Sequence, residues 1–268
     1  MVQLFLLKGA NKDGSVNNGW SPLHLAAFHG HVLVVLALLA AGVDTSLRCG
    51  DEEAPVLHLA AGQGCLEVLK ALIEHGVEVD ATDGNDWTAL HHAAKYGQAE
   101  AIGMLLEAGG NIKAKGVAGG NPLHVAAACL SVESALVLLR HGAQVNSRAS
   151  SPSTPLHCAA FLAGKQGAAE MVDFLLRSGA DETIKNEDGF SAADRIGYGV
   201  EEQDRVAEDF ERVCKLLASA SVDRAWRRRS LFVLSRAHPN RVQLTKQNPR
   251  ARVGMSSGGH VIWNSQRC

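Results

Sequence analysis

The sequence predicts an all-α fold in which helix-turn-helix units stack into a solenoid with hairpin-like loops. A phrase of the type Thr-Pro-Leu-His-x-Ala-Ala occurs five times in the 268 residues. Its histidine recurs first after 34 residues and then three times after 33. After each phrase comes an apolar stretch that ends in a pair of large aliphatic residues, with glycine shortly behind it. A regular period of this length indicates an array whose units bury their core against one another.

Each repeated phrase predicts the first helix of its unit. The hydroxyl of Thr or Ser can cap free backbone N–H groups, and the following proline fits the first helical turn. The two alanines allow close packing against neighbouring helices. A second apolar helix follows and ends at a glycine such as Gly42 or Gly109, because glycine adopts the left-handed conformation at little cost. Turns rich in Gly, Asp and Asn, such as residues 83–86, then lead to the next unit.

Departures from the pattern predict where the array is irregular. Residues 2–11 look like the second helix of a unit without its first helix, which either caps the stack or means that the chain begins inside an array. One extra residue near Pro55 is expected to disturb the start of the first helix of the second repeat. About four extra residues after Phe161 are expected to lengthen a turn. In the last unit Asp194 replaces the histidine, and such a polar unit is the expected C-terminal cap.

These signals divide the chain into a repeat array, residues 1–220, and a basic tail, residues 221–268. The tail is expected to be partly helical and then disordered. The expected divisions of the array are a half repeat at 1–16, repeats at about 17–49, 50–83, 84–116, 117–149 and 150–186, and a degenerate cap at 187–220.

The unit resembles the ankyrin repeat, which has two antiparallel helices followed by a hairpin-like loop. The resemblance covers roughly residues 1–220 and rests on five phrases in register. It implies a non-catalytic scaffold or adaptor that binds another protein on a concave face, formed by the loop tips and the exposed side of the first helices. It implies no cofactor and no small-molecule substrate.

The regularly spaced histidines are expected to be structural rather than catalytic or metal-binding. Equivalent residues in successive units lie about 8–10 Å apart, too far for two imidazoles to share one zinc ion. Each ring can instead hydrogen-bond backbone groups of its own loop or the neighbouring loop. We find no phosphate-binding loop, nucleophile elbow or zinc-protease motif, so no enzyme is expected. The structural repeat histidines are His24, His58, His91, His124 and His157.

Composition favours a reducing compartment, the cytoplasm, the nucleus or both. The six cysteines form no CxxC pair and no spacing that predicts a disulfide framework or a zinc site. The apolar stretch at residues 1–7 is too short for a secretory signal and has no cleavage pattern. No run approaches the roughly 18–20 apolar residues that a membrane span requires.

The variable positions between the phrases are where we expect a partner to bind. Large aromatic side chains with a charged rim are typical of protein-binding hot spots. Acidic loop residues, among them Asp51, Asp83 and Asp86, favour a partner segment that is basic or of mixed charge. The alternative is that some of the rings pack across adjacent loops. The candidate partner-binding residues are Trp20, Phe28, His29, Glu53, Trp87, Lys95, Tyr96 and Phe161, and among them Trp20, Glu53 and Trp87 are expected to stand directly before the capping position of a first helix.

The tail suggests two other functions, because residues 221–268 carry a net charge of +9, whereas residues 1–220 carry a net charge of −11. Residues 224–236 could form a basic amphipathic helix that docks as an extra cap, acts as a nuclear-import or nucleic-acid patch, or recruits another protein. Ser230–Arg236 also resembles the start of a SOCS box, although Ser235 stands where cysteine is usual. The alternative hypotheses are therefore a substrate-recruiting subunit of a ubiquitin ligase and a nucleic-acid-associated regulator. The acidic body argues against nucleic acid outside the tail.

Overall fold

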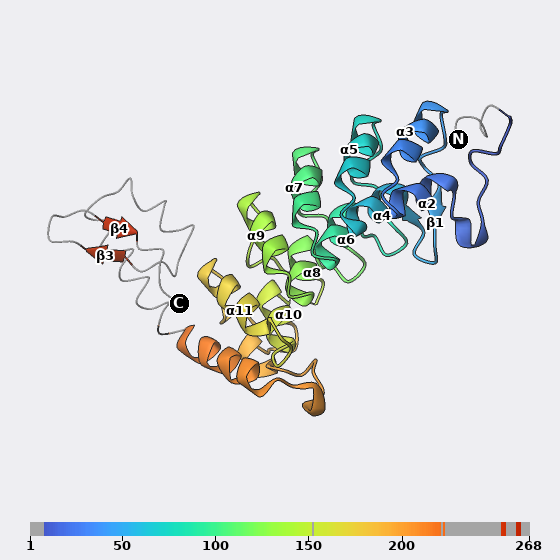
Figure 1. Ribbon diagram of the computed structural model, residues 1–268. Helices are drawn as coiled ribbons and strands as arrows, with labels where there is room; N and C mark the ends of the chain where they lie inside the picture. Colours follow the sequence, from blue (N-terminus) through green and yellow to red (C-terminus); the bar gives the residue numbers. More distant parts are fainter. Residues whose placement is uncertain (1–7, 152, 221, 223–252, 256–260, 264–268) are drawn as a thin grey trace. The chain divides into compact units, whose positions relative to one another are not determined.

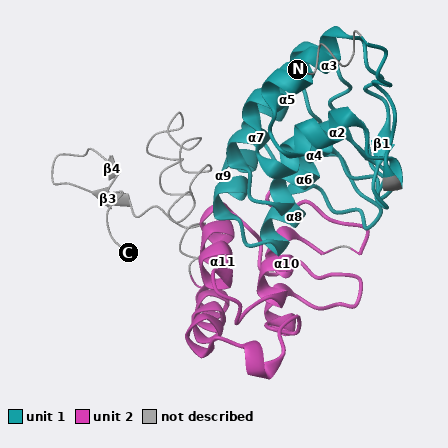
Figure 2. Ribbon diagram, turned by 45° about the vertical axis from the view of Figure 1, so that its right-hand side comes forward, with its two compact units in different colours: residues 1–144 teal, residues 145–268 magenta. Residues whose placement is uncertain are grey.

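The computed structural model describes residues 8–151, 153–220, 222, 253–255 and 261–263. The chain divides into two compact units, residues 1–144 (unit 1) and residues 145–268 (unit 2) (Figure 2). Pairs of short helices dominate both units (Figure 1), which confirms the predicted all-α repeat fold.

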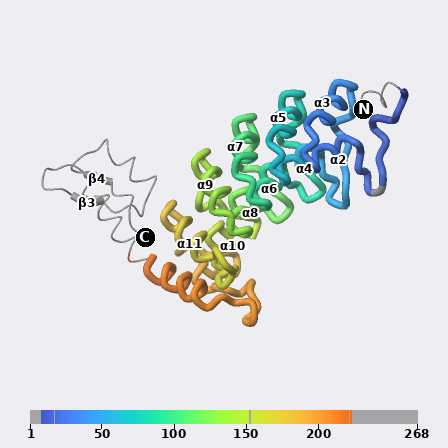
Figure 3. The backbone as a smooth tube through the Cα atoms, viewed as in Figure 1, coloured from blue at the N-terminus to red at the C-terminus, as the bar shows by residue number. Residues whose placement is uncertain are grey.

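Unit 1 contains four helix pairs, repeats 1 to 4, whose helices form an inner and an outer row (Figure 3). Each helix contacts the equivalent helix of the next repeat. The alanine pairs of the inner helices are buried, which lets the helices approach closely. The inner helices are α2 (Pro22–Phe28), α4 (Val56–Gln63), α6 (Ala89–Lys95) and α8 (Pro122–Ala128), and the outer helices are α3 (Val32–Ala40), α5 (Leu66–Glu74), α7 (Ala99–Glu107) and α9 (Val132–Arg140).

Capping residues determine where the inner helices begin. Ser21, Thr88 and Asn121 are N-caps, and each forms a capping box with the histidine three residues later. Their side chains satisfy N–H groups that the first helical turn leaves free. In repeat 2 the N-cap is Pro55, which offers no side-chain hydrogen bond.

The loop before repeat 2 is also irregular, as the extra residue near Pro55 predicted. Strand β1 (Arg48–Cys49) pairs with β2 (Ala54–Pro55), and Glu53 turns between them with a φ of 49°. Ala54 therefore directly precedes the cap, which corrects the predicted register that gave this position to Glu53. A short 3₁₀ helix, η1 (Asn17–Gly19), precedes repeat 1.

Residues 8–14 contact the end of the first outer helix. The ammonium group of Lys12 donates to the carbonyl oxygen of Ala41, and Asp13 Oδ1 accepts from the N–H of Asp44 at 2.8 Å. The same link recurs between Asp80 and Asn111 two repeats later. The half repeat itself remains a prediction, because residues 1–7 lie outside the described residues.

Unit 2 begins with the helix pair α10 (Pro155–Phe161) and α11 (Ala168–Arg177). Residues 162–167 form the longer turn between them. In the polar unit that follows, a short 3₁₀ helix, η2 (Ala192–Arg195), takes the place of an inner helix and contacts α10. A second 3₁₀ helix, η3 (Glu202–Asp204), leads to a helix over residues 207–220.

The tail predictions fall largely outside the described residues. That is the case for the basic helix expected at residues 224–236. Farther along, strand β3 (Val253–Met255) pairs antiparallel with β4 (Val261–Trp263). Within the part of the chain that the structure describes, no helix has the length and apolar character of a membrane span.

Candidate functional site

Three of the candidate binding residues form one aromatic cluster in repeat 1. The Trp20 ring meets Phe28 edge to face, with centroids 5.5 Å apart, and the Phe28 ring meets His29 in the same way at 5.3 Å. Trp20 precedes the cap of α2, whereas Phe28 and His29 end this helix. Phe28 is 36% exposed and Trp20 is half-buried. The rings of the cluster therefore pack against one another and still leave part of their surface open to solvent.

Three further candidates lie together in repeat 3. The Lys95 ammonium lies 5.5 Å from the Trp87 ring centroid and 5.3 Å from that of Tyr96, which gives a cation–π contact on each side. Tyr96 is 53% exposed. Its ring lies against Gly62 of repeat 2, since a Cβ there would approach within 3.1 Å of the ring. Because Gly62 has no side chain, the Tyr96 ring can pack directly against it, and this contact fixes the position of the ring.

Trp87 is the candidate most engaged in packing between loops. Its ring stacks on His91 with centroids 5.7 Å apart and meets His92 edge to face at 5.8 Å. A Cβ at Gly116 would lie only 2.4 Å from a carbon of this ring, so the indole rests on the loop that precedes α8. For Trp87 the structure thus favours the alternative expected from the sequence, packing across adjacent loops.

The other two candidates lie apart from these clusters. Glu53 is exposed at the turn between β1 and β2, where its carbonyl oxygen accepts from Arg48. Phe161 lies in unit 2, 40% exposed at the end of α10. Two residues near it in unit 2, Arg195 and Tyr198, are not among the candidates predicted from the sequence. Alignment to the phrase could have found Tyr198, because it occupies the position of Phe161 one unit later.

His24, His58, His91 and His157 each tie their helix to the following loop. In His24, His91 and His157 the Nδ1 atom bonds the capping residue, and Nε2 lies 3.1–3.2 Å from a carbonyl oxygen 23 to 33 residues later. His124 has the same Nδ1 bond, to Asn121. His58 lies 2.8 Å from the carbonyl oxygen of Trp87 through Nε2, but its buried Nδ1 has no partner, because proline stands at the capping position.

Burial keeps two of these histidines neutral at pH 7. Burial, together with the nearby His92, lowers the pKa of His58 to about 4. Burial likewise lowers the pKa of His91 to about 4, against the opposing effect of its bond to Gly120. Neither group therefore supplies charge to a site at physiological pH.

One group of described residues has the composition of a metal site. The ligand atoms of Glu52, Asp83 and His92 lie within 4.8 Å of one another. However, Asp83 Oδ1 accepts from the N–H groups of Asn85 and Trp87, and Oδ2 lies 2.8 Å from His92 Nε2. Burial would raise the pKa of Asp83, but these bonds together hold that pKa below its ordinary value. Both oxygens are thus engaged in fixing the loop.

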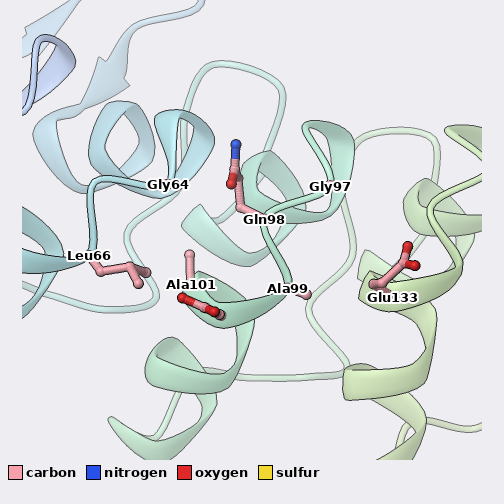
Figure 4. A pocket seen from close by; sticks show the side chains of 8 residues that line it. Gly64, Leu66, Gly97, Gln98, Ala99, Ala101 and Glu133 are labelled. Atoms are coloured by element: carbon pink, nitrogen blue, oxygen red, sulfur yellow. The ribbon is translucent and has the colours of Figure 1, made fainter.

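A separate hollow of about 380 Å³ lies at the turns between inner and outer helices (Figure 4). Small residues line much of it, including Gly64, Gly97 and Ala99, and its charged groups are Glu100 and Glu133. None of the candidate partner-binding residues lines this hollow. Its acidic, open lining offers no convergent set of donors for a small ligand.

The chain is a helical repeat protein, as its stacked helix pairs, its capping boxes and the histidines that bond the next loop show. The residues that pack between repeats recur from one repeat to the next, whereas the exposed residues vary. The family model of a single ankyrin repeat matches residues 18–49. The family model of several ankyrin repeats matches three times, at residues 35–116, 57–149 and 112–186. The chain therefore belongs to the ankyrin repeat family. Ankyrin repeats generally mediate protein–protein interaction, and members of the family are typically non-catalytic.

Solved structures agree with this assignment. The human ASB11 ankyrin repeat domain is similar with a TM-score of 0.67 and 26% identity, over 81% of this chain and 90% of that chain. The ankyrin repeat domain of Bcl-3, described as a unique member of the IkappaB protein family, is similar with a TM-score of 0.64 and 30% identity, over the same shares. A search of curated protein sequences found no match.

Proposed function

We propose that this chain is a non-catalytic scaffold or adaptor that binds a protein partner on the exposed side of α2, α4 and α6. The observation that carries the proposal is Tyr96, which is 53% exposed although Gly62 and Lys95 hold its ring on two sides. A ring that is already positioned loses little conformational freedom on binding. Tyrosine is also among the residues that dominate the energy of protein interfaces.

The proposed partner segment is basic or of mixed charge. Asp51, Glu52 and Glu53 are exposed in the loop before α4, and Asp86 is exposed in the next loop. Arg48, in the same region, donates to the backbone carbonyl oxygens of Glu53 and Thr82. Exposed acidic groups steer a basic partner toward the surface, mainly through the association rate. Lys95, between its two rings, supplies a counterpart for an acidic group on the partner.

Capture of partners from cell extract by the full chain tests the proposal. With Tyr96→Ala we expect loss of the proteins bound by the wild type at a nearly unchanged melting temperature, because the substitution removes exposed surface. Leu33→Glu is the matched control, since Leu33 is 82% exposed on the outer helix α3. Unchanged capture by Tyr96→Ala, or equal loss with Leu33→Glu, would contradict the proposal.

The alternative hypotheses depend on residues 221–268, so removal of this segment distinguishes them. Loss of co-purified elongin or cullin would favour the ubiquitin ligase subunit, and loss of salt-sensitive nucleic acid would favour the nucleic-acid-associated regulator. If the bound proteins stay the same, the binding surface of unit 1 is the better account.

We propose a reducing compartment, the cytoplasm or the nucleus, as the site of action. The described cysteines, which are residues 49, 65, 129, 158 and 214, are free thiols. Burial raises the pKa of Cys49 and of Cys158 to about 11, so both are protonated and unreactive at neutral pH. Fractionation of cells that express the tagged chain would test the compartment.

A further inference from the structure

The last repeat-like segment of unit 2 holds an arginine against two exposed aromatic rings. The guanidinium carbon of Arg195, at the end of η2, lies 5.1 Å from the ring centroid of Phe190 and 5.1 Å from that of Tyr198. Phe190 is 39% exposed and Tyr198 is 68% exposed. The two rings therefore restrict the arginine while they remain open to solvent.

A third ring extends this surface toward α10. The N–H of Gly199 donates to the carbonyl oxygen of Phe161 at 2.8 Å. A Cβ at Gly199 would lie 2.3 Å from a carbon of the Phe161 ring, so this ring rests directly on the backbone next to Tyr198. Phe161 is itself 40% exposed. Phe161, Phe190, Arg195 and Tyr198 thus form one continuous surface, here called the cap surface.

The guanidinium group of the cap surface has hydrogen-bonding capacity to spare. In the described part of the chain, no carboxylate lies within ion-pair distance of Arg195. The adjacent Asp194 is engaged elsewhere, because its Oδ2 accepts from both the N–H and the hydroxyl of Ser191 at 2.7 Å. Stacking uses the faces of a guanidinium group and leaves its N–H edge for an acceptor in the same plane.

The surroundings limit the acceptor to a single carboxylate. Glu187 and Asp188 are exposed just before Phe190, and Glu201 and Glu202 are exposed just after Tyr198. A segment with several acidic residues would be repelled by these four groups. One carboxylate between apolar side chains would pair with Arg195 and bury its neighbours on the three rings.

We propose that the cap surface binds a segment of a partner protein in which one Asp or Glu is flanked by apolar residues. The carboxylate accepts from the Arg195 guanidinium, and the flanking side chains cover Phe161, Phe190 and Tyr198. This site consists of unit 2 residues only and does not depend on the surface proposed in unit 1.

Two capped tripeptides, acetyl-Leu-Glu-Leu-amide and acetyl-Leu-Gln-Leu-amide, test the proposal by NMR titration of the isotope-labelled full chain. The reporters are the side-chain Nε–H of Arg195 and the backbone amide of Gly199. We expect the Glu peptide to shift both signals and to bind about tenfold more tightly than the Gln peptide, because a hydrogen bond to a charged group is lost in the latter. Equal affinities, or no shift up to about 10 mM peptide, would overturn the proposal.

Variants separate this site from general electrostatic attraction. Arg195→Gln should abolish the Gly199 shift, and Arg195→Lys should weaken binding, because lysine keeps the charge but not the planar pair of donors. Lys215→Gln is the matched control, since it removes an exposed cation of unit 2 that pairs with Glu211 on the helix over residues 207–220. An equal loss with Lys215→Gln would refute the site. Backbone spectra that match the wild type outside the cap surface show that each variant is folded, and retained binding by a folded Arg195→Gln variant would also refute it.

Discussion

Replacing Pro55 by threonine should stabilise the array. Pro55 caps α4 without a side-chain bond, and the buried Nδ1 of His58 has no partner. In repeat 3 the equivalent Thr88 gives His91 Nδ1 both a hydroxyl contact at 3.0 Å and an N–H at 3.1 Å. A threonine cap contributes about 1 kcal/mol and satisfying a buried acceptor about another 1 kcal/mol. Loss of the proline's restriction of the unfolded chain costs about 0.4–1 kcal/mol, so the net gain is about 1 kcal/mol.

Urea unfolding followed by circular dichroism measures this gain. We expect a higher midpoint with an unchanged slope, and a melting temperature raised by about 2–4 °C. Pro55→Ala is the control, because it restores the backbone N–H that can reach His58 Nδ1 without adding a hydroxyl, and it should be less stable than the threonine variant. A threonine variant no more stable than the alanine variant would show that the hydroxyl cap has little energetic weight.

Three other changes should give distinct results. Lowering the pH from 7 to 5 should destabilise the array by about 2 kcal/mol for each of His58 and His91. The reason is that the pKa of each group is about 4 in the folded chain and about 6.5 in the unfolded chain. The contribution of each group to stability is therefore complete above pH 6.5 and is lost as the pH falls toward 4. Urea midpoints at the two pH values measure this effect, and a pH-independent midpoint would contradict it. Trp87→Ala should cost about 3 kcal/mol, as expected for truncating a packed tryptophan, whereas Tyr96→Ala should cost under about 1 kcal/mol. Comparable losses in the two melting curves would mean that their division into packing and surface roles is wrong. Leu33→Glu should change stability by less than about 0.5 kcal/mol, because the equivalent positions of the other repeats hold Glu67, Glu100, Glu133 and Glu170. Denaturant midpoints and light scattering check this change, and a marked loss of stability would show that Leu33 is packed.

The parts of the fold that depend on a few neighbouring residues were predictable from the sequence. Ser21, Thr88 and Asn121 cap inner helices as expected, because capping involves only the next three residues. The irregular start of repeat 2 was also expected. Its register was not, because Pro55 stands where the other repeats have a capping side chain, and the pairing of β1 with β2 moves Glu53 into a turn.

The candidate site was less predictable, because exposure depends on residues that are distant in the sequence. Trp87 and Tyr96 are both aromatic residues at variable positions, yet the Trp87 ring packs against Gly116, in the loop that precedes α8. Gly62 receives the Tyr96 ring from repeat 2, but leaves it half exposed. A glycine at such a position is visible in the sequence, but the ring that covers it is not.

The histidine bonds make the stability of each repeat in unit 1 depend more on the repeat that follows it than on the repeat that precedes it. His91 forms its capping box with Thr88 within its own repeat, whereas its Nε2 atom depends on the carbonyl oxygen of Gly120 in repeat 4. If repeat 4 opens, α6 therefore loses a bond at its start. If repeat 2 opens, the capping box of α6 stays complete. Opening of a repeat thus weakens the neighbour that precedes it more than the neighbour that follows, so unfolding that begins in repeat 4 spreads toward the N-terminus.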